Sequence, residues 1–572
     1  MHWPQIPRFE FRIASVLIPA LVFLYPLVLA SHIPLLDPDE GLHASIAQEM
    51  VERGDWIVPR LFGEPFLDKP ILYFWCEALS LRLWGMSEAA VRLPGLLLGL
   101  AGAVTTAAVA GRLFDRRTGL VAGLCYATTI LPAALAQAAA HDVALVPLVN
   151  LSLLLFWEAD QSPIPNPQSP PAAPSGYPAR PLNAALTALN GLVLGLAILT
   201  KGLAGVAIVG IAYGGYLLAA RRLRLVHCLR GTVALIIAVA VAAGWYLAVE
   251  HRCEGYLRYY FVERHMMGFA TGTQRHGGAH WWYYLPVLLG GGLPWVAYLP
   301  VTFYDAWRQR RRSDLAPPSG GRPLVLLGCW LVGGTLFLSL GHAKLVTYVW
   351  PLFPAVPILT AAAWSRLIDG RLSQPAARWL GAVVWGSCLL GPLLPPGLLL
   401  VVQRTMAIPF SAAAWTTMIL AGLTAWIPLA FWRTGRPQKA LAAAMLAMAA
   451  QFAVTMTVAL PPVAELYSAR ELATYVNHVG RLPGRLFLVN ERVGSLVFYL
   501  DRDLRADLPA DRIASLDVGG RPPVFAAEDL IAVPDRAAAK ALPWLRLGDA
   551  AFQQAGHYRV YGAAAGRVLR GP

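Results

Sequence analysis

The fold is decided by long apolar runs, of which Gly231–Glu250 is representative: GTVALIIAVAVAAGWYLAVE. A run of about 20 apolar residues is what a helix needs to cross a hydrocarbon core of about 30 Å. Of the 572 residues, 57% are hydrophobic and only 14% are charged, whereas a soluble domain has roughly a quarter of its residues charged. The sequence therefore predicts an α-helical polytopic membrane protein.

Twelve further runs of this kind occur, so we expect about thirteen transmembrane helices. The first, Ile13–His32, follows two arginines and ends near small residues, which leaves a cleavable signal peptide as the alternative. Its length favours an uncleaved span with the N-terminus in the cytoplasm. The other spans are expected approximately at 91–111, 119–138, 143–159, 183–200, 202–220, 231–250, 282–306, 323–341, 346–364, 379–402, 409–432 and 440–461.

Arginine clusters in the short connections set the expected orientation. With thirteen spans, all of them fall on the same side, which the positive-inside rule assigns to the cytoplasm. Counting the apolar stretch Pro70–Trp84 as another span would move every later cluster outside, so we interpret it as an interfacial helix. The net charge of +14 is thus a topology signal and not a sign of nucleic-acid binding. The clusters are Arg112/Arg116/Arg117, Arg221/Arg222/Arg224/Arg230, Arg308/Arg310/Arg311/Arg312, Arg366/Arg371/Arg378 and Arg433/Arg436/Lys439.

The composition divides the chain into two parts. Residues 1–461 carry the spans, with outer loops at 33–90 and 251–281, and a Pro-rich inner linker at Pro163–Pro181. Residues 462–572 are more polar and predict a small α/β domain on the outer side, with helices at 469–479 and 494–500 and strands at 486–489, 530–533 and 558–561. The six cysteines are scattered without a CxxC pair, so no disulfide framework or zinc site is indicated.

The ionisable residues outside the arginine clusters gather on the outer side. Charged groups at a membrane boundary are costly unless paired or hydrated, so a shared polar cavity is the economical explanation. Each of these residues, taken alone, also has an interpretation that involves no function. An acid can cap a helix, a lysine can extend to the lipid headgroups, and a lone histidine can be a solvated surface residue. The residues in question are Asp37, Asp39, Glu40, Lys69, Asp142, Lys201, Glu254, Arg258, Glu263, Arg264, His265, Arg275, His276 and Lys344.

Such a cavity suits an amphipathic anionic substrate, for example a sugar on a lipid phosphate. A phosphate leaving group needs cations to stabilise it rather than a general acid, and a carboxylate can accept the proton of the acceptor. The sequence has no GxxxxGK[ST], HExxH or GxSxG motif and no GxGxxG after a strand. Nucleotide-driven transport and zinc-dependent hydrolysis therefore lose support.

Several motifs resemble a known family. They are Pro38-Asp39-Glu40, Gly54-Asp55-Trp56, Asp68-Lys69-Pro70, Val91-Arg92-Leu93-Pro94, Thr200-Lys201-Gly202, Trp281-Trp282-Tyr283-Tyr284 and Lys344-Leu345 with Thr347-Tyr348. Together they resemble the aminoarabinose (4-amino-4-deoxy-L-arabinose) transferases that modify lipid A, which belong with the protein O-mannosyltransferases in the GT-C class. The similarity spans nearly the whole chain in order.

The resemblance implies a bacterial inner-membrane enzyme that takes its sugar from undecaprenyl phosphate and inverts the anomeric centre. It implies that Asp39, with its neighbour Glu40 and the second acid Asp142, is catalytic. The donor phosphate and lipid would be bound by Lys69, Lys201, Tyr348, Lys344 and Arg258, with His265, His43 and Asp68 near the site. No cofactor is implied, and binding of a divalent metal is left open.

Departures from the family pattern leave the sugar and the acceptor open. Gly41-Leu42-His43 stands where the family generally has Thr-Arg-Tyr, Ala144 stands where a proline often follows the second acid, and Val346 interrupts the Lys-Leu-Pro-Thr-Tyr pattern. The alternatives are a protein O-mannosyltransferase-like enzyme and a lipid or lipid-linked-sugar transporter. A transporter usually shows internal repeats and ionisable residues near the bilayer midplane, which this sequence lacks.

Overall fold

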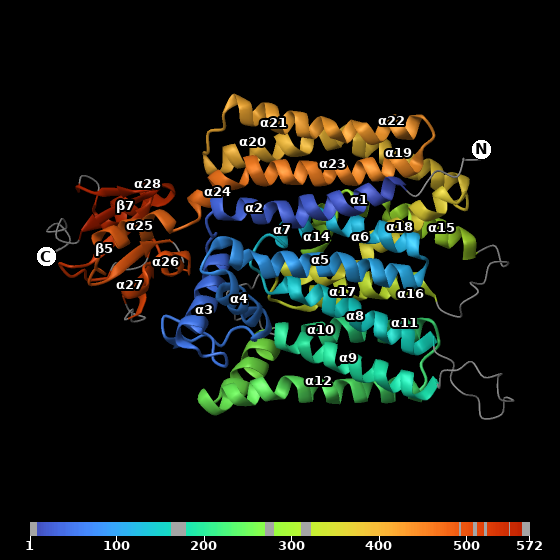
Figure 1. The fold of residues 1–572 in the computed structure, drawn as a ribbon, viewed down its shortest axis with the longest axis horizontal. Coiled ribbons are helices and arrows are strands. Elements are labelled where there is room, and N and C mark those ends of the chain that lie inside the picture. Colours follow the sequence, from blue (N-terminus) through green and yellow to red (C-terminus); the bar gives the residue numbers. More distant parts are fainter. Residues whose placement is uncertain are drawn as a thin grey trace.

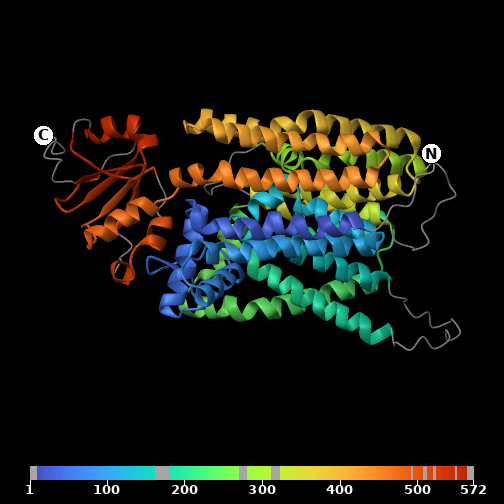
Figure 2. The same ribbon diagram turned by 45° about the horizontal axis from the view of Figure 1, so that its top comes forward.

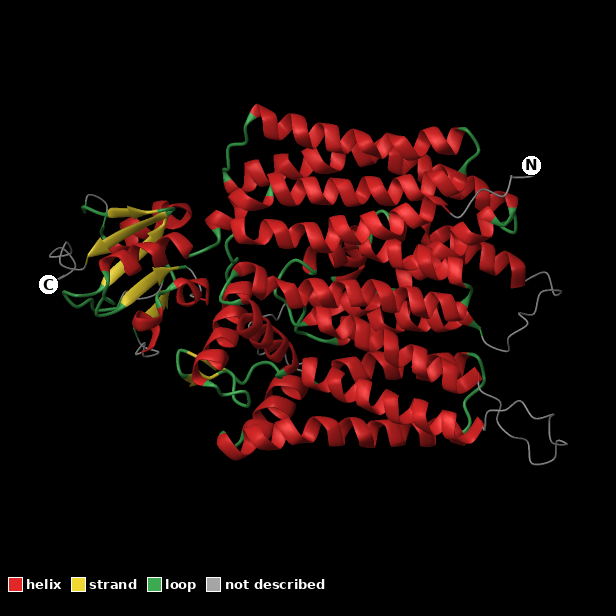
Figure 3. Ribbon diagram, viewed as in Figure 1, coloured by secondary structure: helices red, strands yellow, loops and turns green. Residues whose placement is uncertain are grey.

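The computed structural model describes residues 9–161, 179–268, 280–310, 322–490, 494–506, 512–519, 523–547 and 550–562. Within these ranges the chain forms a long bundle of helices with a small α/β domain beyond one end (Figure 1). The strands among the described residues lie in that domain and in one short hairpin, β1 (Arg60–Leu61) with β2 (Glu64–Pro65) (Figure 3). The predicted fold class is confirmed. Most of the Pro-rich linker, together with Arg275 and His276, lies outside the described residues.

A helix or pair of helices lies at each of the thirteen predicted spans. They are α1 (Phe9–Pro19) with α2 (Tyr25–Leu29), α5 (Glu88–Leu113), α6 (Arg116–Ala127) with α7 (Ile130–Leu135), α8 (Asp142–Gln161), α9 (Ala179–Lys201), α10 (Ala204–Val209) with α11 (Gly215–Ala219), α12 (Leu225–Arg252), α14 (Tyr284–Gly291) with α15 (Leu299–Arg310), α16 (Pro323–Gly328) with α17 (Gly334–Leu340), α18 (Ala355–Ile368), α19 (Gln374–Leu390) with α20 (Leu394–Met406), α21 (Ala412–Leu423) with α22 (Ile427–Arg433), and α23 (Pro437–Val458).

The structure has fewer candidate membrane spans than the thirteen predicted. Among the described residues, eight helices are long and apolar enough to cross a membrane, or up to ten if each of two bent pairs is one span. Ile13–Leu29 and Ala204–Ala219 are shorter apolar helices, and the segment at 116–135 is interrupted at Thr128–Thr129 between α6 and α7. A hydropathy pattern counts apolar residues across such interruptions, which explains the higher number.

The stretch Pro70–Trp84, predicted to be an interfacial helix, is helical. This stretch forms α4 (Leu72–Trp84), which packs beside α3 (Asp39–Arg53) and is not among the candidate membrane spans. Both helices lie at the end of the bundle that carries the C-terminal domain, and the turned view agrees (Figure 2).

The arginine-rich connections meet at one place, as predicted. Ion pairs join connections that are distant in sequence: Arg112 to Glu158 at 3.5 Å, Arg117 to Asp369 at 3.1 Å, and Arg222 to Asp160 at 3.3 Å. Because each pair links the ends of different helices, these connections share one end of the bundle. Figure 1 places the start of α1 and the end of α15 there, opposite α3 and α4.

The C-terminal domain is built on a five-stranded sheet of order β4-β3-β5-β7-β6. Strand β3 pairs in parallel with β4 and β5, whereas β7 pairs antiparallel with β5 and β6. The predicted elements α25, α26, β3, β5 and β7 are confirmed, and β4, β6, α27 and α28 were not foreseen. The elements are α24 (Leu460–Leu466), α25 (Arg470–Val479), β3 (Leu486–Val489), α26 (Gly494–Tyr499), α27 (Arg502–Ala506), β4 (Ile513–Leu516), β5 (Leu530–Pro534), α28 (Asp535–Leu545), β6 (Gln553–Ala555) and β7 (Tyr558–Gly562).

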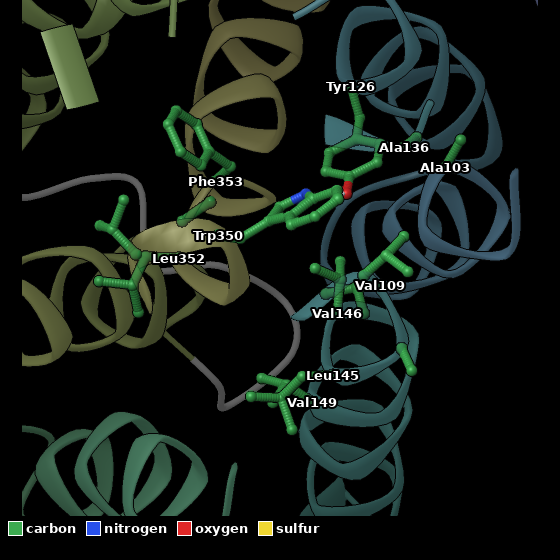
Figure 4. Packing of buried hydrophobic residues seen from close by; sticks show 14 of the residues in the cluster. Ala103, Val109, Tyr126, Ala136, Leu145, Val146, Val149, Trp350, Leu352 and Phe353 are labelled. Carbon is green, nitrogen blue, oxygen red and sulfur yellow. The ribbon is translucent and has the colours of Figure 1, made fainter. Parts of the chain in front are cut away.

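The core of the bundle fixes the segment that leads into α18. Trp350 lies fully buried in the 3₁₀ segment Val346–Leu352, and its indole N–H donates to the hydroxyl of Tyr126 at 3.1 Å. Figure 4 shows the indole pointing toward Tyr126, with Val109 and Val146 close by. A buried tryptophan that satisfies its N–H in this way has one favoured position. The same segment carries Tyr348, so the core also places that residue.

Candidate active site

The first-loop acids lie in the first turn of α3, and Glu40 is locked there. Its two carboxylate oxygens each accept a hydrogen bond from the Arg92 guanidinium of α5, at 2.7 Å, and Oε2 also accepts from the backbone N–H of Leu36 at 2.9 Å. Arg92 donates further to the carbonyls of Ala30, Ile33 and Pro34 at 2.6–3.1 Å. Glu40 is only 4% exposed, so this carboxylate fixes the loop and is not available to a substrate.

Asp39 has the opposite environment. It is exposed, and no described residue forms a hydrogen bond or ion pair with its carboxylate. Burial lowers the pKa of both Lys69 and His43, and the nearby Asp39 carboxylate opposes this lowering at each. An exposed carboxylate beside a lysine, on a helix whose next residue is locked, is suited to take a proton from a bound hydroxyl.

A cavity of about 380 Å³ includes Lys69, the lysine near Asp39, in its lining. Its charged lining side chains are the three cations Lys69, Lys201 and Arg264 and the single acid Asp68. The rest of the lining is largely apolar and comes from α8, α10, α17 and nearby segments. The site is therefore cationic in one part and apolar in another. The apolar side chains include Leu145, Leu203, Ala204, Ala207, Ile208, Phe337 and Leu338.

The cations are held by neighbours from distant parts of the chain. Arg264, in the π-helical segment Arg258–Met267, pairs with Asp68 at 2.8 Å, and Asp68 also accepts a hydrogen bond from the hydroxyl of Tyr259 at 2.5 Å. Burial and the nearby Arg264 lower the pKa of Lys69, while Asp39 and Asp68 act against this shift. Lys69 and Arg264 lie close together with Asp68 as their shared acid, so this part of the site favours the binding of an anion.

Lys201 ends α9 and lies between two predicted site residues. Its ammonium group forms an ion pair with the buried Asp142 at the start of α8 and lies 4.0 Å from the centre of the Tyr348 ring. The structure thus brings Asp142, Lys201 and Tyr348 together, and Lys201 and Tyr348 line the cavity. The ion pair engages the carboxylate of Asp142 and fixes the position of the Lys201 ammonium group.

The backbone conformation at position 202 and the space around it explain why the Thr200-Lys201-Gly202 motif ends in glycine. Gly202 has a φ of +61°, and a Cβ at this position would lie 2.6 Å from Nε2 of His265 and 3.1 Å from the hydroxyl of Tyr260. His265 is further held by a 2.8 Å hydrogen bond between its Nδ1 and the carbonyl of Tyr260, and burial is the main cause that lowers its pKa. Gly202 therefore lets the π-helical segment close over Lys201.

We expect Gly202→Ala to destabilise the fold by about 1–2 kcal/mol, the cost of a left-handed conformation for a residue with a side chain. Movement of His265 would add to this cost. The measurement is the midpoint of thermal unfolding in detergent. Gly210→Ala is the control, because Gly210 has a helical φ and the added Cβ would meet no atom within 4 Å outside the nearby backbone of its own helix. Equal midpoints for the two variants would contradict the assigned role of Gly202.

The remaining predicted residues take different places. His43 is buried below Asp39 with its Nδ1 2.5 Å from the carbonyl of Ala139, and burial lowers its pKa to about 4. Lys344 is buried and donates to the carbonyl of Gly341 at 2.5 Å, so it supports the cavity wall that Gly341 lines. Arg258 is not brought to the cavity: its side chain is 82% exposed and pairs with Glu263 at 3.6 Å.

Two site residues were not given a role by the sequence, Arg92 and Arg264. Each acts through a partner far away in the chain, Glu40 in one case and Asp68 in the other. The sequence shows Arg92 in a motif that resembles a known family and Arg264 in a charged loop, but it does not show the partner of either residue. In the part of the chain that the structure covers, no group of three or more His, Cys, Asp and Glu side chains is placed to hold a metal ion.

Comparison with known proteins identifies the family. A family model described as dolichyl-phosphate-mannose-protein mannosyltransferase matches residues 68–164. Undecaprenyl phosphate-alpha-4-amino-4-deoxy-L-arabinose arabinosyl transferase 2 of Pseudomonas fluorescens is 32% identical over 422 residues, which are 73% of this chain and 71% of that protein. The chain belongs to this arabinosyl transferase family. The corresponding transferase of Edwardsiella ictaluri is 33% identical over 334 residues, 58% of this chain and 56% of that protein.

The matched segment thus spans less than two thirds of some relatives, including 64% of the transferase of Aeromonas salmonicida. The fold matches over a longer range. The crystal structure of ArnT from Cupriavidus metallidurans bound to undecaprenyl phosphate superimposes with a TM-score of 0.72, covering 97% of this chain and 99% of that one at 22% identity. At this identity the match establishes the shared fold of the family.

Proposed function

We propose that this chain is a membrane glycosyltransferase that transfers a sugar from undecaprenyl phosphate to a lipid A-type or other cell-envelope acceptor. The observation that carries the proposal is the cavity in which Lys69, Lys201 and Arg264 face a largely apolar lining. A polyprenyl phosphate is an anion on an apolar chain, and the two parts of the cavity fit its two parts. The names of the arabinosyl transferase relatives support the same donor.

In this proposal the cations bind the phosphate throughout the reaction. The bond from the anomeric carbon to the phosphate oxygen breaks, and the bond from that carbon to the acceptor oxygen forms on the opposite face, so the configuration is inverted. Negative charge develops on the leaving phosphate, where Lys69, Lys201 and Arg264 stabilise it. The leaving group is undecaprenyl phosphate, which needs no proton at neutral pH.

Asp39 is the proposed base in this reaction. Its exposed carboxylate accepts the proton of the acceptor hydroxyl as the new bond forms, while Glu40 and Asp142 act as positioning residues through Arg92 and Lys201. His43, His265, Tyr348 and Lys344 shape the site around these groups. Neither Glu40 nor Asp142 is placed to replace Asp39, because each already forms an ion pair with a cation.

The proposed sugar is 4-amino-4-deoxy-L-arabinose, as in the names of the relatives. The change to Gly41-Leu42-His43 begins two residues after the proposed base, where α3 meets α26, and none of these three residues lines the donor cavity. The proposed location is the bacterial inner membrane, with the arginine-rich end in the cytoplasm and both the site and residues 462–572 in the periplasm. Residues 1–461 form the catalytic part in this division.

We test the proposal by reconstituting the protein with an undecaprenyl phosphate-linked sugar and measuring transfer by mass spectrometry of the lipid acceptor. Lys69→Met is expected to weaken binding of undecaprenyl phosphate by about 10- to 100-fold, which corresponds to the roughly 1.5–3 kcal/mol of a hydrogen bond to a charged group. Binding is measured by titration with undecaprenyl phosphate.

Lys540→Met is the matched control, because Lys540 is an exposed lysine on α28 away from the cavity. Lys69→Arg keeps the charge and is expected to retain most of the affinity. Unchanged affinity in Lys69→Met, or an equal loss in Lys540→Met, would remove Lys69 from the proposed phosphate site.

A further inference from the structure

The first turn of α3 is held from outside the bundle by the C-terminal domain. Asp37, two residues before Asp39, accepts a 2.8 Å hydrogen bond from the backbone N–H of Ser495 and a second bond from the Ser495 hydroxyl. The backbone N–H of Asp37 donates to the carbonyl of Tyr467 at 2.7 Å. Ser495 is fully buried and its hydroxyl also accepts from the backbone N–H of Ala469 at 2.8 Å. These contacts fix the residue that leads into α3.

Helices α3 and α26 touch at two glycines. A Cβ on Gly41 would collide with the backbone of Ser495, and a Cβ on Gly494 would collide with the backbone of Leu42. The hydroxyl of Ser45, one turn further along α3, donates to the carbonyl of Gly494 at 2.6 Å. Two backbones that approach this closely leave little freedom for either helix to move.

Other contacts surround this crossing. The hydroxyl of Tyr499 donates to Glu88 at 3.0 Å and accepts from the backbone N–H of Leu35 at 2.8 Å. Arg505 of α27 forms an ion pair with Glu52 near the far end of α3. The C-terminal domain therefore meets the loop before α3, the first turn of α3 and its last turn.

Asp39 lies between two fixed points of different origin. The residue after it, Glu40, is held by Arg92 of α5 inside the bundle, and Asp37 before it is held by Ser495 of the C-terminal domain. We infer that the C-terminal domain completes the active site by positioning Asp39, and that Ser495 and Gly494 are positioning residues for transfer. This inference rests on the proposed function, in which Asp39 is the base.

The first test is transfer by Ser495→Ala. Loss of the hydroxyl removes one of the two bonds to Asp37, and displacement of a reacting group by about 1 Å can cost on the order of 100-fold in rate. We expect kcat to fall at least about tenfold, with the KM for the donor and the affinity for undecaprenyl phosphate unchanged, because the donor cavity lies on other residues. A smaller folded fraction would instead lower the apparent kcat and the number of binding sites for undecaprenyl phosphate by the same factor.

Ser515→Ala is the matched control. Ser515 is an exposed serine on β4 of the same domain, and its substitution should leave kcat unchanged. Asp37→Ala and the double variant Asp37→Ala/Ser495→Ala complete the set. If the two residues act through their mutual contact, the double variant loses no more activity than Asp37→Ala alone.

Hydrogen exchange of the full chain provides a measurement that does not depend on activity. Amide exchange over residues 37–45 should increase in Ser495→Ala and remain as in the wild type in Ser515→Ala. Increased exchange with an unchanged kcat would overturn the inference, and so would unchanged exchange. Absence of transfer by the wild-type protein would count against the proposed function, while the exchange result would still decide whether the domain holds α3.

Discussion

Asp39→Asn is expected to give a folded protein that binds undecaprenyl phosphate like the wild type and transfers sugar about 10²- to 10⁴-fold more slowly, the usual contribution of a general base. The amide keeps the size of the side chain but cannot accept a proton at neutral pH. The side chains that line the donor cavity are all retained, since Asp39 is not one of them. The measurement is the single-turnover rate of transfer in proteoliposomes, with binding of undecaprenyl phosphate measured in parallel.

Asp517→Asn is the control for the same chemical change. Asp517 is an exposed aspartate in the C-terminal domain, so this variant should transfer at the wild-type rate. Transfer by Asp39→Asn at the wild-type rate would remove Asp39 from the mechanism. Loss of undecaprenyl phosphate binding in the same variant would instead show that this carboxylate organises the donor site.

The arrangement of the bundle was predictable because two effects dominate it: the burial of apolar helices in the membrane and the preference of arginine-rich connections for one side. Apolar length determines where a helix crosses, and the ion pairs of Arg112, Arg117 and Arg222 show that the arginine-rich connections do share one end. The number of uninterrupted spans was not predictable. Breaks such as Thr128–Thr129 depend on what each helix packs against, and hydropathy carries no information on that.

The site was predictable in its residue types and less so in their roles. Asp39, Lys69 and Lys201 were expected from their place on the outer side and from family motifs, and the structure brings Lys69 and Lys201 to one cavity. Asp39 and Glu40 are adjacent carboxylates, so the sequence alone does not distinguish their roles. Only the position of Arg92, 52 residues away, shows that one is locked and the other is exposed. Arg258 was misplaced for the same reason, since a charged loop does not reveal which side chains turn inward.

The departure at Gly41 has a structural explanation. A Cβ at this position would collide with the backbone of Ser495, so a side chain like the threonine common in the family would require α26 to lie further away. Gly494 makes the matching approach from the other helix. The change in the first-loop motif thus accompanies a close helix crossing with the C-terminal domain, which motif comparison alone would have attributed to the substrate.

Arg92→Met is the substitution with the largest expected effect on stability. It leaves Glu40 buried without its partner and frees the carbonyls of Ala30, Ile33 and Pro34. Removing one member of a buried ion pair costs about 3–5 kcal/mol. We expect the midpoint of thermal unfolding in detergent to fall well below that of Arg82→Met, the control, since Arg82 is exposed on α4.

The double variant Arg92→Met/Glu40→Met separates the two contributions to this loss. If the main cost is the unpaired buried carboxylate, the double variant should regain much of the stability, because an apolar pair of similar volume can replace a buried ion pair without loss. If the carbonyls of the loop before α3 matter more, the double variant stays as unstable as Arg92→Met. In either case transfer should remain low, since Asp39 loses the locked neighbour that sets its position on α3. Wild-type stability in Arg92→Met would show that the loop is held by the C-terminal domain alone.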